Sequence, residues 1–385
     1  MIQFFARVVE LREEKSVKCD GKITMDFPSR EFLEVTQNLK EKTVMKAGVF
    51  FKENDLRVME IDKPVPKDNE VLIKVMACGV CGTDVHIFCG DEGCFPTPSG
   101  TVLGHEFAGL VEAVGKDVHS VRAGDRVCVD PNQLCGECYY CRSGIGHFCE
   151  KMTGIGTGVN GGFAQYCTVP QSQVYKIADT TSYEEAAMTE PVACCLHGMD
   201  LCRVSCGDTV AVIGGGMIGM IMLQLAKISG AGTLIMIEPV AEKREIAKKL
   251  GADICIDPIG ENVKEALAAN RIDRISCVIE CVGKTSTMEQ AIDIAGKKSV
   301  VMLFGLTAPD DAMSVKPFEI FKKEIELMAS FINPYTQKRA LELIDHKKID
   351  VSSIVYAYEG LDQLPVILSD AKLRAKGKFI IRPQK

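Results

Sequence analysis

A histidine and a glutamate stand side by side at residues 103–109, between glycines and inside an otherwise apolar run. Imidazole nitrogens and carboxylate oxygens are both common zinc ligands. We therefore interpret His105 and Glu106 as the centre of a metal site. An isolated His-Glu pair is more often an ordinary surface pair, so this interpretation requires further ligands from elsewhere in the chain.

Four cysteines follow one another at short spacing in one segment: Cys135, Cys138, Cys141 and Cys149. Four thiolates can close a tetrahedral sphere around Zn²⁺ and leave no open position, which is typical of a structural zinc site. An iron-sulfur cluster is the competing interpretation, because the first three cysteines have a ferredoxin-like spacing. The longer gap before Cys149, and Glu150 in place of proline, depart from that pattern and favour zinc. His147, inside the same segment, is expected to be a surface residue.

A buried-strand pattern at Thr209–Ile213 runs directly into a glycine-rich turn and a segment compatible with a helix. In this context glycines allow a tight turn, close approach of the backbone to a pyrophosphate, and close packing of the helix on the strand. The start of the helix then receives the phosphates. The segment therefore predicts a dinucleotide site. Its expected cofactor-binding residues are Gly214, Gly216, Met217, Ile218 and Gly219.

Glu238 closes the next expected strand, where a carboxylate can accept hydrogen bonds from both hydroxyls of an adenosine ribose. The same carboxylate would repel a 2′-phosphate, so the sequence favours NAD over NADP. Lys243 and Arg244 follow closely and could partly accommodate such a phosphate. For Lys243, a cofactor contact and a solvated helix position are equally good interpretations.

The composition limits the class of protein. A chain of 385 residues favours two domains, and 46% hydrophobic with 25% charged residues is typical of globular proteins. The formal net charge of -7 argues against nucleic acid as a partner, and no apolar run reaches the roughly 18 residues of a membrane span. Disulfide scaffolds are short and loop-rich, and this chain is neither. Its 18 cysteines therefore favour a cytoplasmic protein with free thiols and metal ligands.

The elements that must position these residues fall into two groups. Short β-branched runs bounded by Gly, Pro and Asp predict a mostly β domain from Val44 to about Ile177. Ser182 and Glu185 have the spacing of a capping box, which opens a helical stretch to about Cys202. Strand and helix candidates then alternate, which predicts an α/β fold with a parallel sheet and helices on both faces. The predicted domains are 44–199 with 333–385, and 200–332, while 1–43 remains unassigned.

These motifs together closely resemble the zinc-dependent medium-chain dehydrogenase/reductase family, from about Met45 to the C-terminus. The motifs that carry the resemblance are Cys81-Gly82-Thr83-Asp84, Gly104-His105-Glu106-x2-Gly109-x5-Gly115-x2-Val118, the four-cysteine segment and the glycine turn. Glu190-Pro191 makes the chain most similar to the polyol (sorbitol-type) branch. The resemblance implies a GroES-like β-rich catalytic domain plus a Rossmann doubly wound parallel sheet, in a homodimer or homotetramer.

The resemblance also implies a catalytic zinc site. Cys81 and His105 match ligands of that zinc, and Glu106 and Glu190 match acidic residues that bind the metal directly or through water. The alcohol-dehydrogenase branch usually has a cysteine at the Glu190 position. A carboxylate there makes a harder site with room for water or a vicinal diol, which favours polyols as substrates.

Thr83 resembles the first member of the family's proton relay, because its hydroxyl can both accept and donate a hydrogen bond. His86, three residues later, resembles the outlet of that relay to solvent. Cys194 and Cys195 are close to Glu190 in sequence. On a helix they are expected to face away from it and to pack in the core.

The resulting hypothesis is an enzyme that transfers a hydride between NAD and a secondary alcohol, specifically a polyol or sugar alcohol, with catalytic and structural Zn²⁺. Its partner is a small-molecule alcohol or ketone. L-Threonine 3-dehydrogenase and vicinal-diol (butanediol) dehydrogenase are alternatives, although the threonine branch usually carries Asp at the Glu190 position. A non-catalytic NADH-binding protein is an alternative of another class, and it would need none of the metal and relay residues. Substrate specificity is expected around Ile87, Phe88 and Phe95.

Overall fold

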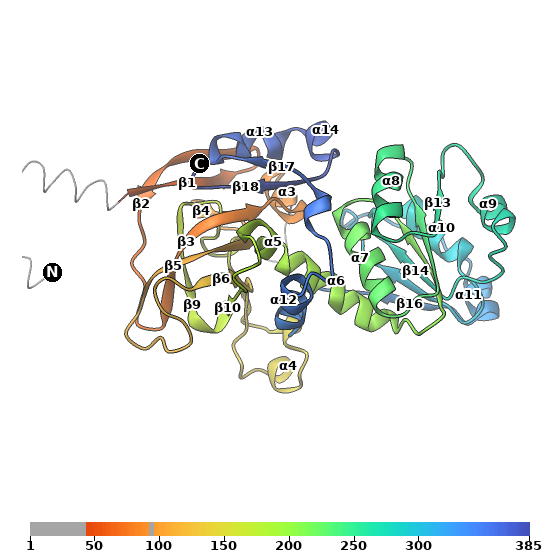
Figure 1. Cartoon of the computed structure of the whole chain (residues 1–385), viewed down its shortest axis with the longest axis horizontal. Coiled ribbons are helices and arrows are strands. Elements are labelled where there is room, and N and C mark those ends of the chain that lie inside the picture. The colour runs from red at the N-terminus through yellow and green to blue at the C-terminus, as the bar shows by residue number, and fades with distance from the viewer. Residues whose placement is uncertain (1–43, 92–95) are drawn as a thin grey trace, which may run out of the picture. The chain divides into compact units, whose positions relative to one another are not determined.

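The computed structural model describes residues 44–91 and 96–385 (Figure 1). The N-terminal segment 1–43 and Phe95 lie outside the described residues. Val44–Lys385 forms one compact unit, so the domain boundaries expected within it stay predictions. Within the described ranges, every helix is too short or too polar to cross a membrane.

Mostly antiparallel strands make the β-rich part of the chain. One sheet has the order β2-β1-β4, and a seven-stranded sheet has the order β10-β6-β5-β3-β18-β17, with β9 also paired to β3. The strands are β1 Val44–Lys52, β2 Asp55–Asp62, β3 Glu70–Gly79, β4 Thr101–Val102, β5 Glu106–Val114, β6 Arg126–Val129, β9 Tyr166–Pro170, β10 Val174–Lys176, β17 Val355–Glu359 and β18 Lys378–Ile381. A separate small hairpin is formed by β7 Asn132–Gln133 and β8 Thr153–Gly154.

Short helices connect these strands and close the chain. They are α3 Gly82–Phe88, α4 Tyr139–Arg142, η1 Gly146–Phe148, η2 Gln171–Gln173, α5 Tyr183–Ala187, η3 Ser352–Ile354, η4 Leu361–Gln363, α13 Leu364–Ser369 and α14 Ala371–Arg374. The capping box expected at Ser182 begins α5, where Ser182 Oγ accepts from the Glu185 amide at 3.2 Å. The helical stretch then breaks at Met188 and continues as a second helix.

Strand β3 is the meeting point of three segments that are distant in sequence. It pairs antiparallel with β5, which sets Gly79 opposite Glu106. It also pairs antiparallel with β18, which sets Gly79 opposite Ile380. The C-terminal segment therefore returns to the β-rich sheet and ends beside the residues that the sequence marks as metal ligands.

The second group of strands forms a six-stranded sheet in which all pairs are parallel. Its order, β13-β12-β11-β14-β15-β16, is the 3-2-1-4-5-6 order of a doubly wound dinucleotide fold. The strands are β11 Thr209–Ile213, β12 Thr233–Ile237, β13 Ile254–Ile256, β14 Cys277–Glu280, β15 Val300–Leu303 and β16 Glu326–Ala329. The helices are α7 Met217–Ile228, α8 Ala241–Leu250, α9 Val263–Ala269, α10 Thr285–Ile294 and α11 Pro317–Lys323. The predicted α/β class is confirmed.

Successive residues of the parallel strands pack on opposite faces of this sheet. In β11, Val210 and Val212 belong to one buried apolar cluster, and Ala211 and Ile213 belong to another. Both faces are therefore covered, which explains why the strand reads as a continuous apolar run rather than as an alternating one.

Helix α6, Thr189–Cys202, connects the two parts through one continuous core. Its buried residues pack in the same apolar cluster as residues of β3, β11 and α7. Thr336 Oγ1 donates to the Ala193 carbonyl at 2.7 Å and fastens α12, Gln337–Asp345, to α6. The helix that carries the acidic residue of the Glu-Pro motif is thus held from both sides.

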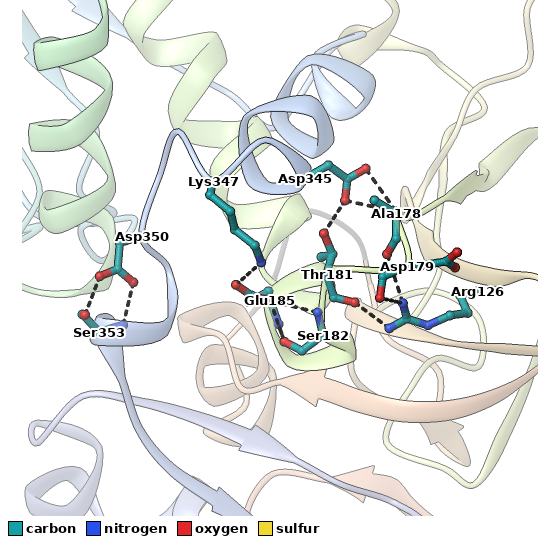
Figure 2. A network of polar contacts seen from close by, with 10 residues as sticks. All are labelled: Arg126, Ala178, Asp179, Thr181, Ser182, Glu185, Asp345, Lys347, Asp350 and Ser353. Atoms are coloured by element: carbon teal, nitrogen blue, oxygen red, sulfur yellow. Dashed lines mark hydrogen bonds and ion pairs between the residues drawn. The ribbon is translucent and has the colours of Figure 1, made fainter.

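A polar network at the C-terminal end of α12 joins that helix to α5 (Figure 2). Asp345 accepts hydrogen bonds from Thr181 Oγ1 at 2.6 Å and from the Ala178 amide at 3.2 Å. Lys347 forms an ion pair of 2.6 Å with Glu185. These contacts hold α5 and the residues just before it against the end of α12.

Candidate active site

Three metal-ligating side chains meet where β3 ends and β5 begins. One ligand atom from each of Cys81, His105 and Glu106 lies within 4.8 Å of the other two. Cys81 directly precedes α3, and His105 directly precedes β5. Zn²⁺ accepts thiolate, imidazole and carboxylate ligands. The structure thus brings together residues that the sequence singled out separately, in an arrangement that can share one divalent ion.

A buried carboxylate lies beside the imidazole of His105. Asp84 Oδ2 accepts a hydrogen bond from the Cys81 amide at 2.8 Å, and Asp84 Oδ1 lies 3.4 Å from His105 Nδ1. Burial alone would lower the pKa of His105, but the charges of Asp84 and Cys81 outweigh it and raise the pKa well above its usual range. Because Nδ1 faces Asp84, Nε2 is left for a metal ion, as is common for zinc-binding histidines.

Lys378 is a residue of the site that the sequence interpretation missed. Its side chain is 2% exposed, and Nζ donates to Glu106 Oε2 and to the Val80 carbonyl, the latter at 2.9 Å. Burial lowers the pKa of Lys378, but the Glu106 charge more than compensates and the net shift is upward. The available signal was a lysine at the head of the apolar run Lys378-Phe379-Ile380-Ile381, since lysine is almost never fully buried unless paired.

Gly79 makes room for this buried ion pair. A Cβ at residue 79 would lie 2.1 Å from Glu106 Oε2 and 2.9 Å from Lys378 Cε. Any larger side chain at the end of β3 would therefore collide with the paired charges. The other oxygen, Glu106 Oε1, has no hydrogen-bond partner among the described residues, which leaves it free for a metal ion or a water molecule.

Glu190 is a second carboxylate beside the ligand set rather than a member of it. It lies in the first turn of α6 and is 8% exposed. Burial raises the pKa of Glu190 to about 7, with His105 acting against the shift and Glu106 adding to it. The start of a helix favours a negative charge. Glu190 is therefore a buried acidic group at the start of α6 whose pKa responds to the charges of His105 and Glu106.

The expectation that Cys194 faces away from Glu190 is wrong. Cys194 Sγ donates a hydrogen bond to Glu190 Oε1 at 3.2 Å. The two residues are four positions apart on α6, and side chains at this spacing lie on the same face of a helix. Burial and the Glu190 charge raise the pKa of Cys194 well above its usual range, so the thiol keeps its proton. Cys195, in contrast, is fully buried in the core as expected.

The four-cysteine segment brings its thiols together at a second point. The sulfur atoms of Cys135, Cys138, Cys141 and Cys149 lie within 4.8 Å of one another, and all four are free thiols. The Cys138 amide donates to Cys135 Sγ at 3.4 Å, and the Cys135 amide donates to Cys149 Sγ at 3.3 Å. The backbone amides of Cys141 and Glu150 lower the pKa of Cys138 to about 6. Such donors favour the thiolate, which is the form that binds metal.

The expectation that His147 is a surface residue is wrong. It is 9% exposed, and its ring centroid lies 4.1 Å from that of Phe148 and 5.3 Å from that of His197. His197 belongs to α6, so His147 packs the four-cysteine segment against that helix. It is not a member of the four-thiol set. The contact joins residues 50 positions apart, which no local pattern reveals.

A cleft of about 370 Å³ runs from the metal-ligand set to the glycine turn. Cys81 and His86 line it on the β-rich side, and Gly215, Gly216 and Met217 line it at the start of α7. Ligands of doubly wound sheets bind outside the carboxyl ends of the strands, where the strand order reverses. The metal-ligand set and the glycine turn therefore open onto the same cleft.

The two expected relay residues lie on α3. Cys81 Sγ and Thr83 Oγ1 are 3.7 Å apart, so the hydroxyl adjoins the metal-ligand set. His86 Nδ1 lies 3.0 Å from Asp91 Oδ2 at the partly exposed end of the helix. Ile87 and Phe88 of this helix, around which substrate specificity is expected, are buried in the apolar core.

The glycine turn has the geometry expected of a phosphate-binding loop. Gly214 has a φ of +99°, which favours glycine, and a Cβ at Gly219 would lie 1.8 Å from the Gly214 carbonyl oxygen. Gly216 precedes α7, and a Cβ there would meet open space. Met217 borders the cleft, whereas Ile218 packs partly against the core.

Glu238 stands at the end of β12, beside this turn. Its Oε2 accepts a hydrogen bond from the Gly215 amide at 2.6 Å, and its Oε1 accepts one from the Val240 amide at 2.9 Å. Each carboxylate oxygen keeps a lone pair for a ribose hydroxyl. Arg244 donates to the Glu238 carbonyl at 2.7 Å and forms an ion pair of 3.2 Å with an aspartate, so its charge is already committed. Lys243 borders the cleft.

Comparison with known proteins identifies the family. The model of the alcohol dehydrogenase GroES-like domain matches residues 67–179, and that of the zinc-binding dehydrogenase matches residues 218–346. The chain is 30% identical to D-arabinitol dehydrogenase 1 of Uromyces fabae over 343 residues, which are 88% of this chain and 97% of that protein. The chain therefore belongs to the zinc-binding dehydrogenases of the alcohol dehydrogenase family.

Other relatives extend over the same length. L-Threonine 3-dehydrogenase of Pyrococcus abyssi is 35% identical, over 84% of this chain and 94% of its own. A solved structure from Sinorhizobium meliloti, described as a zinc-binding dehydrogenase bound to NADP, has a TM-score of 0.85 and 35% identity. That comparison covers 89% of this chain and all of the other. The similarity confirms the GroES-like and Rossmann combination that the motifs implied.

The buried ion pair of the site generates a testable prediction. Lys378→Met is expected to lower the free energy of unfolding of the metal-free protein by about 3–5 kcal/mol, because Glu106 then stays buried without a cation. Denaturant unfolding followed by circular dichroism measures this loss. The double variant Lys378→Met/Glu106→Gln has neither charge and should recover most of the stability. Equal losses in the single and double variants would show that the ion pair is not the cause.

Proposed function

We propose that the chain is a zinc-dependent dehydrogenase that transfers a hydride between NAD and a polyol or sugar alcohol. The observation that carries this proposal is the cleft, which Cys81 and His86 share with Gly215 and Gly216. A metal-ligand set at one end and a phosphate-binding helix start at the other would hold a substrate carbon near a nicotinamide ring. NAD supplies the hydride acceptor, and the protein supplies position and charge.

In this proposal Cys81 and His105 bind the catalytic zinc, and Glu106 and Glu190 act on the metal directly or through water. The donors fit Zn²⁺, which in catalytic sites is held by a few protein ligands and keeps one position open. Bound Zn²⁺ would polarise a substrate oxygen as a Lewis acid, which favours loss of its proton. Two observations support this assignment: no described residue forms a hydrogen bond with Glu106 Oε1, and Asp84 lies beside the His105 ring.

Cys135, Cys138, Cys141 and Cys149 are proposed to hold a second, structural zinc. The set contains four thiols and offers no open position for a substrate. The backbone amides that donate to these sulfur atoms favour the thiolate forms that a metal requires. Through His147, this segment would brace helix α6.

Thr83 and His86 are proposed to carry the alcohol proton to solvent. The Thr83 hydroxyl adjoins the metal-ligand set, and it can accept one hydrogen bond while donating another. His86 lies one turn later on α3, where its ring borders the cleft. Asp91, 3.0 Å from His86 Nδ1, would stabilise the protonated imidazole between acceptance of the proton and its release.

The cofactor pyrophosphate is proposed to lie over the glycine turn and to meet Lys376 from the opposite wall. Three cations line that wall. Arg374 is held by the Ile367 carbonyl at 3.0 Å, and Lys378 is held by Glu106. Lys376 has no side-chain hydrogen bond or ion pair within the described part of the chain, and its Nζ lies over the Tyr356 ring, 5.6 Å from the centroid. Its ammonium is therefore the one on this wall best able to reach a phosphate.

NAD rather than NADP is the proposed cofactor, on the strength of Glu238. Its carboxylate is buried beside the turn and can accept from ribose hydroxyls, but it would repel a 2′-phosphate. Arg244 is already engaged in other contacts. Of the two nearby cations, Lys243 is therefore the one that could offset this repulsion.

A polyol is the proposed substrate class. Glu190 places a carboxylate beside the ligand set, and carboxylate oxygens accept hydrogen bonds from neighbouring hydroxyls of one substrate. D-Arabinitol dehydrogenase 1 is among the relatives of the chain, which agrees with this class. Threonine, the substrate in the name of another relative, is the alternative that an assay must include.

A homodimer or homotetramer is proposed as the assembly. Strand β16 lies at the edge of the parallel sheet, with Leu327 on it and Phe331 just after it each 37% exposed. An exposed apolar edge strand favours pairing with another chain. Light scattering of the purified protein measures the assembly.

The metal assignment predicts two zinc ions per chain. Cys81→Ala should lose one of them and at least about 100-fold of the activity, since even partners that merely orient zinc ligands cost 10–100-fold when removed. Metal analysis and turnover measure both effects. Cys128→Ala, a buried thiol outside both ligand sets, is the control and should keep two zinc ions. Full activity in Cys81→Ala with one zinc would overturn the catalytic assignment, and iron with inorganic sulfide would indicate a cluster instead.

The substrate class is tested by following NADH appearance with a panel of sugar alcohols, vicinal diols and threonine. The highest kcat/KM is expected for a sugar alcohol, and the protein without Trp gives little background for NADH fluorescence. Preference for threonine or butanediol would move the chain to the corresponding alternative. NADH binding without turnover of any member would favour a binding protein.

The cofactor preference is tested with Glu238→Ser. Two unit charges about 4 Å apart repel by on the order of 1 kcal/mol even in water, so removing one should shift the NADP to NAD ratio of kcat/KM by at least about fivefold. Steady-state kinetics with both cofactors measures this ratio. Glu242→Ser, an exposed carboxylate on α8, is the matched control. An unchanged ratio in Glu238→Ser would count against its ribose role.

A further inference from the structure

Cys194 is a half-buried thiol beside the candidate metal site that the proposed reaction does not use. Its neighbour Cys195 is fully buried in the core, whereas Cys194 turns toward Glu190. The Cys194 thiol and Glu190 Oε1 are 3.2 Å apart on the same face of α6.

Cys194 makes the one side-chain hydrogen bond to Glu190 that the described residues provide. Its sulfur lies 3.2 Å from Oε1, one helical turn along α6. A carboxylate has two oxygens, and a donor held on one of them restricts rotation of the whole group. Oε2 is then the oxygen that no described side chain holds.

We infer that Cys194 is a positioning residue whose S–H group holds Glu190 Oε1 and leaves Oε2 for the metal or its water. This inference rests on the proposed function, because it presumes that Glu190 acts at the zinc. Groups that orient the ligands of a metal commonly tune its affinity and its activity.

A direct role of Cys194 as a metal ligand is the competing possibility. A thiolate bound to zinc has no proton to give, whereas here the sulfur acts as a donor to a carboxylate. This contact favours a thiol that orients Glu190 over a thiolate that replaces it.

The inference is tested with Co²⁺ exchanged into the catalytic site of the full-length holoenzyme, under conditions that leave one zinc per chain. Four proteins are compared: the wild type, Cys194→Ala, Cys194→Ser and the control Cys195→Ala. The measurements are the visible and near-ultraviolet spectrum, the rate of metal loss to a chelator, and kcat with KM.

In Cys194→Ala, the visible Co²⁺ bands should shift, metal loss should become about 10-fold faster, and kcat should fall while the thiolate-to-cobalt charge-transfer band keeps its intensity. Cys194→Ser retains a hydrogen-bond donor, so its Co²⁺ bands should return to the wild-type positions. Its rate of metal loss and its kcat should lie within about threefold of the wild-type values. Cys195→Ala creates a cavity in the core, so it should lower the melting temperature without moving the spectrum.

Three results would overturn the inference. Wild-type spectra and metal loss in Cys194→Ala would show that the hydrogen bond positions nothing. Loss of charge-transfer intensity would show that Cys194 is itself a ligand. An equal spectral shift in Cys195→Ala would show that the effect comes from packing.

Glu190→Ala separates failure of this inference from failure of the proposed function. If Glu190→Ala changes the spectrum and the activity but Cys194→Ala does not, only the positioning role of Cys194 is refuted. If Glu190→Ala matches the wild type, the proposed role of Glu190 at the metal fails, and the inference fails with it.

Discussion

The site depends on a negative charge that folding removes from water. Glu106 is fully buried, and an isolated carboxylate in such surroundings would be strongly destabilising. Lys378 supplies the compensating cation from the last strand of the chain, and Gly79 supplies the space for the pair. The pairing of β18 with β3 therefore shapes the candidate metal site, although β18 contributes no expected ligand. The candidate ligands, the Lys378 cation and the space that Gly79 leaves for the ion pair all lie at the end of β3.

Helix α6 imposes the second constraint. Its core residues pack against both the β-rich part and the parallel sheet, so the position of Glu190 follows from that packing rather than from the loops around the metal. Thr336 holds the same helix from α12, and the Asp345 network ties α12 to the segment that leads into α5, the helix before α6. His147 adds a contact from the four-cysteine segment. Because α6 is held by contacts on several sides, the position of the Glu190 carboxylate is well defined. Cys194, one helical turn later, can then set the orientation of that carboxylate.

Local motifs were predictable because their function and their geometry lie in the same few residues. The glycine turn, the four-cysteine segment and the capping box at Ser182 all have the form that their spacing indicated. Cys194 was misjudged although the signal was present, since residues four apart on a helix share a face. His147 could not be judged in the same way. Its burial depends on His197, which only the tertiary fold brings near.

The sequence by itself determined the chemical types of the donors, the parallel sheet and the dinucleotide turn, because spacing and hydrophobic pattern are local properties. Only the tertiary structure decided which charges are buried and what compensates them. Glu106 and Lys378 are 272 positions apart, and their pairing arises from strand register and from the cost of an unpaired buried charge. The sequence around Glu106 alone, or around Lys378 alone, predicts neither the strand register nor the pairing of the two charges.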